Sequence, residues 1–203
     1  MVKREKSWAA AAAFALLVTM FPLSAMAASG PVTFKMVVSA GARTCLPNAT
    51  ATVKITPTGP VEIMDVAVSG LPPNTDFDFF VIQIPVSPFG IAWYQGDIET
   101  DETGSGHQRF IGRFSIETFS VAVGVAPAPI VFNSGQFPNA NMNPPFNPIQ
   151  MYHLGLWFNS RDDARKNGCP DGVTPFNGEH DAGIQVLNTS NFPNLDGPLR
   201  NVQ

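Results

Sequence analysis

Residues 77–84 read Phe-Asp-Phe-Phe-Val-Ile-Gln-Ile, a stretch nearly continuous in apolar side chains. Its length suits a β-strand, and Pro85 and Pro88 end it because proline has no N–H to donate to a strand ladder. A strand that is apolar on both faces lies inside a structure rather than at its surface. The stretch therefore predicts a central strand, covered on both sides, around which the rest of the chain is built.

Stretches on either side alternate apolar with polar residues, which is typical of strands with one face in a core. The glycine-containing segment 100–106 separates two of them and predicts a hairpin between strands 90–98 and 107–119. Turns rich in glycine and proline separate most of the others. The remaining predicted strands are 32–38, 50–56, 61–68, 151–158 and 184–187.

The composition agrees with short strands joined by many turns. Of 203 residues, 44% are apolar and only 14% are charged, with 17 glycines and 19 prolines. Such a chain is too apolar for a disordered protein. The net charge of −4 provides no basic surface for nucleic acid or for an anionic membrane.

The first 27 residues have the pattern of a secretory signal peptide. Lys3, Arg4 and Lys6 precede an apolar run from 8 to 20, and Ala25-Met26-Ala27 follows. The run is too short to span a bilayer, which needs about 20 residues, and its small final residues suit cleavage before Ala28. We therefore expect a secreted or periplasmic protein with no membrane span in the mature chain.

The mature chain, 28–203, is long enough for one domain with a sizeable core. Cleavage removes three basic residues and one acidic residue, so the net charge falls from −4 to −6. Cys45 and Cys169 both remain. An oxidising compartment favours a disulfide between them, the alternative being two buried free thiols.

Three segments fall outside the strand pattern. Ser160 with Asp163 predicts the start of a short helix that ends near Gly168. Residues 125–148 hold many prolines and asparagines and predict a long loop, either a partner-binding loop or a cover over the domain. The tail 191–203 is predicted to be loose. Together the elements indicate an all-β, single antiparallel β-sandwich of about eight strands.

Two turn motifs carry a resemblance. The turn 70–75 (Gly-Leu-Pro-Pro-Asn-Thr) and the turn 100–106 (Thr-Asp-Glu-Thr-Gly-Ser-Gly) resemble those of bacterial extracellular immunoglobulin-like modules. Over roughly residues 60–120, with the blocks 93–97 and 108–114, the chain is similar to an uncharacterised group of secreted bacterial proteins. The resemblance implies secretion and an immunoglobulin-like sandwich. It implies no catalytic residue.

Acidic residues and histidines are the candidate metal ligands. Asp97, Glu99 and Asp101 alternate along one strand and would offer three oxygens to Ca²⁺, but a solvated hairpin turn kept soluble by its charges is the favoured interpretation. Zn²⁺ prefers nitrogen and oxygen donors but usually from closely spaced ligands, and no short His-x-x-x-His spacing occurs. The residues considered for Zn²⁺ are His107, His153, His180 and Glu179. His107 and His153 alternate opposite the apolar residues of their strands and are expected to be exposed.

Signals for catalysis are weak. The chain has no Gly-x-Ser-x-Gly nucleophile elbow, and Ser105 lies in a predicted turn. The pair Glu99 and Glu117 could serve glycoside hydrolysis only at a separation that the sequence does not define.

Aromatic residues are the candidate binding groups. Trp93, Tyr94 and Trp157 could stack on sugar rings, the alternative being that they fill the core. Trp93 and Tyr94 are neighbours and point to opposite faces of a strand, so one of them is expected to fill the core.

The leading hypothesis is a secreted, non-catalytic binding or structural module without a cofactor, with an extracellular protein, glycan or surface as its partner. The alternative is a protein that depends on Ca²⁺ or Zn²⁺, or a hydrolase, using the histidines and carboxylates. A third hypothesis is self-assembly through an edge strand, since an open sheet has unpaired edges.

Overall fold

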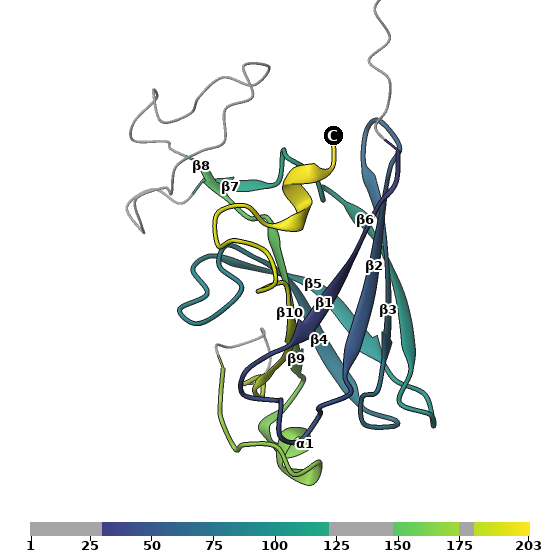
Figure 1. Cartoon of the computed structure of the whole chain (residues 1–203), viewed down its shortest axis with the longest axis vertical. Helices are drawn as coiled ribbons and strands as arrows, with labels where there is room; N and C mark the ends of the chain where they lie inside the picture. The colour runs from purple at the N-terminus through teal and green to yellow at the C-terminus, as the bar shows by residue number, and fades with distance from the viewer. Residues whose placement is uncertain (1–29, 122–147, 175–180) are drawn as a thin grey trace, which may run out of the picture.

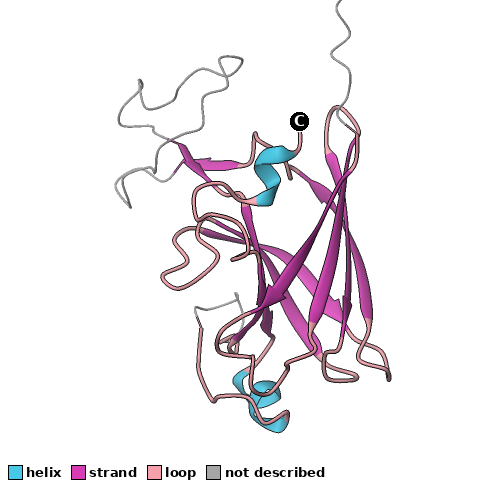
Figure 2. Cartoon of the chain, viewed as in Figure 1, coloured by secondary structure: helices cyan, strands magenta, loops and turns pink. Residues whose placement is uncertain are grey.

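The computed structural model describes residues 30–121, 148–174 and 181–203. These residues form strands and two short helical segments (Figures 1 and 2). The elements are β1 Val32–Val38, β2 Thr50–Pro57, β3 Glu62–Ser69, β4 Asp76–Ile82, β5 Ala92–Glu99, β6 Gly106–Gly112, β7 Phe119–Val121, β8 Pro148–Gln150, β9 His153–Phe158, α1 Arg161–Lys166, β10 Gln185–Asn188 and the 3₁₀ segment η2 Pro198–Asn201.

Eight of the strands form one antiparallel sheet in the order β5-β4-β9-β10-β1-β2-β3-β6. Strand β1 stands at the middle of this order because residues 32–36 pair with β2 while Val37 and Val38 pair with β10. The sheet curls into a barrel-like form. The prediction of an antiparallel β fold with a short helix is confirmed, whereas the sandwich and its immunoglobulin-like character stay predictions.

The predicted hairpin between β5 and β6 is wrong, although the turn between them exists. Strand β5 pairs with β4, and β6 pairs with β3, so these consecutive strands form the two ends of the sheet. Phe110 of β6 stacks on Phe79 of β4 with ring centroids 5.2 Å apart. The Phe110 ring also lies against Gly96 of β5, because a Cβ at Gly96 would be 3.3 Å from Phe110 Cε1. The aromatic stack thus occupies the space between the two ends of the sheet.

Strand β4 is the covered central strand that the sequence predicts. It lies between β5 and β9, and Phe77, Phe79 and Val81 point into the main core. On the opposite face, Ile82 forms a second apolar cluster with Trp157 and Ala182. The segment between β4 and β5 covers this cluster, with the Phe89 ring set edge-on to Trp157 at 5.1 Å.

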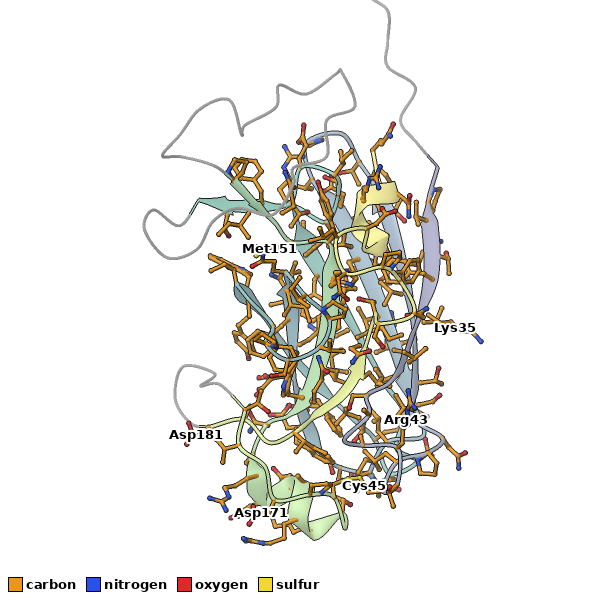
Figure 3. All side chains as sticks on the ribbon, turned by 60° about the vertical axis from the view of Figure 1, so that its left-hand side comes forward. Lys35, Arg43, Cys45, Met151, Asp171 and Asp181 are labelled. Carbon is orange, nitrogen blue, oxygen red and sulfur yellow. A yellow bond between two sulfur atoms is a disulfide. The ribbon has the colours of Figure 1, made fainter. Side chains whose placement is uncertain are left out.

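The helix and the disulfide are confirmed. Ser160 caps α1 by accepting a hydrogen bond from the Asp163 N–H at 3.1 Å. Gly168 follows with φ of 71°, a conformation that glycine adopts without strain. The turn places Cys169 so that it bonds Cys45 of the β1–β2 connection, at the end of the molecule where α1 lies (Figure 3).

The C-terminal tail differs from the loose segment expected. Leu199 and Val202 are completely buried in the main core, and the backbone of Val202 accepts a hydrogen bond from the Ile116 N–H at 2.9 Å. Apolar residues spaced three apart on a short helical turn point to one side, so even a proline-rich tail can fill a core. Most of the predicted loop 125–148 lies outside the described residues.

Candidate functional site

The two turn motifs of the sequence form a single structural junction. The Leu71 N–H donates to the Gly104 carbonyl at 3.2 Å, and the Asn74 N–H donates to the Asp101 carbonyl at 3.1 Å. Between them, the buried Thr100 hydroxyl donates to the Pro72 carbonyl at 2.6 Å. Gly104 has φ of 73°, and a Cβ there would come within 1.9 Å of the Leu71 oxygen. These motifs therefore build the fold.

Asp101, one of the three predicted calcium ligands, belongs to this junction. Its Oδ1 accepts hydrogen bonds from the Thr103 hydroxyl at 2.6 Å, the Thr103 N–H at 2.8 Å and the Ser105 N–H at 3.1 Å. These bonds favour the charged carboxylate and lower the pKa of Asp101. The Asp101 carboxylate therefore stabilises the turn 100–106 and does not join Asp97 and Glu99 as a third calcium ligand.

Asp97 and Glu99 do lie on one face of β5, and β4 places two further carboxylates opposite them. The strand register pairs Asp97 with Asp78 and Glu99 with Asp76. Burial, followed by the nearby charge of Asp97, raises the pKa of Asp76. Like charges in directly opposite positions destabilise a sheet. Among the described residues, no lysine, arginine or histidine forms an ion pair with Asp76, Asp97 or Glu99.

Trp93 and Tyr94 are both exposed, at 61% and 43%. The expectation that one of them fills the core is wrong: the register pairs Trp93 with Val81 and Tyr94 with Phe80, so the two rings lie on opposite faces of this end strand, and both are exposed to solvent. The Tyr94 hydroxyl donates to Asp97 Oδ1 at 2.5 Å, and burial followed by this bond raises the pKa of Tyr94. We call Trp93, Tyr94, Asp97 and Glu99 the β5 surface.

The backbone of β5 is open beside these aromatic side chains. The Gln83 N–H donates to the Ile91 carbonyl at 2.8 Å, which marks these residues as a hydrogen-bonded pair. Hydrogen-bonded and non-hydrogen-bonded pairs alternate along an antiparallel ladder, so the polar backbone groups of Ala92 and Tyr94 point away from β4. Within the described part of the chain, no strand pairs with this edge.

Trp157 cannot serve as a binding platform because only 3% of it is exposed. Its ring contacts Phe80 and Phe89 at centroid distances of 5.2 and 5.1 Å. The indole also lies against Gly155, where a Cβ would come within 2.3 Å of the ring. Trp157 is thus the centre of the second apolar cluster.

The histidines do not converge. His153 is fully buried, contrary to the expected exposure: its Nδ1 lies 2.8 Å from the Thr189 hydroxyl and its Nε2 lies 3.1 Å from the carbonyls of Pro193 and Asn194. Burial lowers its pKa. His107 is exposed, 3.5 Å from Asp65. Glu179 and His180 lie outside the described residues, and the described ones contain no group of three or more side chains that could hold a metal ion.

The residues considered for catalysis have structural contacts instead. The Ser105 N–H donates to Asp101, and Glu117 forms an ion pair with Arg113 at 3.5 Å. In the described ranges, no helix is long and apolar enough to cross a membrane.

Sequence reasoning missed Asp76 and Asp78, which only the strand register brings opposite the β5 carboxylates. The signal that could have found them is the spacing of two acids at alternate positions in an otherwise apolar strand. Neither a protein-family model nor any curated protein matches the chain, so its own residues carry the functional argument.

Proposed function

We propose that the protein is a secreted, non-catalytic module that binds an extracellular partner or forms part of an extracellular structure through its β5 surface. The observation that carries this proposal is the exposure of two adjacent aromatic side chains on an end strand with an open backbone edge. Exposed aromatic residues are enriched at protein interfaces, and an open edge strand is able to pair with another chain unless something covers it.

The charge pattern supports the same surface. Asp97 and Glu99 lie beside Tyr94 and directly opposite the carboxylates of β4. Burial, followed by the nearby charges of Asp97 and Glu99, raises the pKa of Asp76, and a cationic group placed beside these three carboxylates would relieve the repulsion. The β5 surface therefore combines apolar contact area with unneutralised negative charge.

Secretion and the finer fold belong to the same proposal. The signal-like N-terminus and the Cys45–Cys169 disulfide are what an exported protein would have. The first part of β1 pairs with β2 and its last two residues pair with β10. This pairing is compatible with an immunoglobulin-like sandwich in which one strand belongs to both layers. For the alternative of a metal-dependent protein, the described residues contain no group of three or more candidate metal ligands.

The proposal is tested by probing arrays of soluble glycans and of short peptides with the purified protein. The variant Trp93→Ser/Tyr94→Ser is probed in parallel, together with the control Phe119→Ser, whose aromatic ring is 54% exposed on β7. We expect ligands of the wild type to be lost by the double variant and kept by the control. Equal binding by the wild type and the double variant would contradict a role for β5.

A further inference from the structure

We propose that the partner of the β5 surface is a second copy of the same chain, which docks through the outer face of β3 and β6. This inference rests on the proposed function and names its partner. It depends on a second surface of the molecule that complements the β5 surface in charge and in apolar character.

The complementary surface lies on the solvent side of β1, β2, β3 and β6. Strand register places Lys54, Asp65 and Arg109 in one row across three strands. The neighbouring row runs through Lys35 and Thr52 to His107. We call the residues Lys35, Lys54, Ile63, His107, Arg109 and Ile111 the β3–β6 face.

This face has an excess of positive charge. Its carboxylate, Asp65, accepts hydrogen bonds from Arg109 at 2.8 and 3.3 Å, and the Arg109 guanidinium lowers the pKa of Asp65. In the described part of the chain, Lys35 and Lys54 form no ion pair. Figure 3 shows Lys35 extending from the ribbon into solvent. Two ammonium groups are therefore free to meet carboxylates of another molecule.

The β3–β6 face also carries exposed apolar area. Ile63 and Ile111 are directly opposite in the antiparallel register, and Ile111 is 68% exposed. On the β5 surface, the corresponding apolar area comes from Tyr94, whose hydroxyl bonds Asp97, while Trp93 extends it from the other face of the end strand. Each surface thus places apolar side chains beside a net charge, and the net charges of the two surfaces have opposite signs.

Because the two surfaces differ, contact between them is heterologous: each copy offers one surface to a neighbour on either side. Such contacts produce rings when the rotation closes and filaments when it does not. Contact between two β5 surfaces would instead bring carboxylates together, which is unfavourable. A second copy accordingly fits the β5 surface better through its β3–β6 face than through its own β5 surface.

Sedimentation velocity of the purified protein over a range of concentrations tests the inference. We expect association at low ionic strength that weakens as salt rises from about 0.01 M to about 1 M, since the Debye length shortens from about 30 to 3 Å. Two charge-reversal variants, Asp97→Lys/Glu99→Lys and Lys35→Glu/Lys54→Glu, should each remain monomeric. An equimolar mixture of the two should associate again, because every contact in it joins opposite charges.

Arg165→Glu/Lys166→Glu on α1 is the control, with the same change in charge away from both surfaces. It should associate like the wild type. If a reversed variant fails to fold, the isosteric Asp97→Asn/Glu99→Gln variant takes its place and should weaken association. A wild type that is monomeric at every concentration, or a mixture that stays monomeric, would overturn the inference. The array experiment tests the proposed function separately. If the protein is monomeric but binds a peptide or glycan through β5, the proposed function holds although the inference of self-association is wrong.

Discussion

The outer face of the sheet is open to solvent on β2, β3 and β6, the open half, and covered on β4, β9 and β10, the covered half. In β2 and β3, buried residues alternate with more exposed ones, whereas Phe110 is the one buried residue of β6; the outer face of these strands carries charges. In β9 and β10 every residue is buried, and β4 is close to that condition. The covered half supports a second apolar cluster and anchors the tail, whereas the open half is free for contacts. The difference separates the strands that carry the second apolar cluster from the strands whose outer face is open to solvent.

The disulfide joins the two halves, so its loss should have the largest effect. Cys45 lies between β1 and β2, and Cys169 follows α1 on the covered side, 124 residues away in sequence. In the chain-entropy model a cross-link of this span contributes about 5 kcal/mol. We expect Cys45→Ser/Cys169→Ser to lose stability on that scale in urea titrations. A loss below about 1 kcal/mol would mean that the halves hold together without the cross-link.

Truncating an aromatic side chain on the covered face should cost nearly as much. Trp157→Ala removes the centre of the second cluster and should lower the free energy of unfolding by about 3–5 kcal/mol. The matched change on the open face, Ile111→Ala, should stay within about 0.5 kcal/mol because that side chain is exposed. Chemical denaturation compares the two. Similar losses for both variants would abolish the distinction between the faces.

The junction of the two turns should have an intermediate effect. Thr100→Val removes the hydroxyl that donates to the Pro72 carbonyl and accepts from the Thr75 N–H, and leaves buried polar groups without partners. We expect a loss of about 1–3 kcal/mol. Thr103→Val, which alters an exposed hydroxyl in the same turn, is the control for thermal melts. If Thr103→Val lost more stability than Thr100→Val, the stabilising contacts of the junction would lie in the exposed part of the turn.

His153 should give the covered half a sensitivity to acid. Burial lowers its pKa below the ordinary value of about 6.5, so the unfolded chain binds a proton in a range where the folded chain does not. The contribution of neutral His153 to the free energy of unfolding is fully present above about pH 6.5 and is lost as the pH falls toward the folded-state pKa. The slope is at most about 1.4 kcal/mol per pH unit.

Urea titrations at several pH values measure this slope. His153→Gln should reduce it, and His107→Gln, on the open face, should leave it as in the wild type. An unchanged slope in His153→Gln would assign the acid sensitivity to other groups.

Local patterns in the sequence were enough to predict much of this fold. The apolar run of β4, the Ser160 cap and the cysteine pair each depend on nearby residues or on compartment, and each is confirmed. The split of β5 and β6 to the two ends of the sheet was not predictable, because β5 pairs with β4 and β6 with β3, and local alternation does not specify which strands pair. The burial of His153 was missed for a similar reason: its partners come from a tail more than 35 residues away. Of the candidate site, the sequence supplied Trp93, Tyr94, Asp97 and Glu99, while their carboxylate neighbours required the register.

Hydrogen exchange of the purified protein, followed by mass spectrometry on peptides from β4 and β5, decides whether β5 presents an open edge. In dilute solution we expect slow exchange throughout β4 and fast exchange at Ala92 and Tyr94, whose amides face the open edge. At high concentration the β5 peptide should become protected while the β4 peptide stays the same. Exchange in β5 as slow as in β4 under dilute conditions would contradict an open edge strand as the contact surface of this protein.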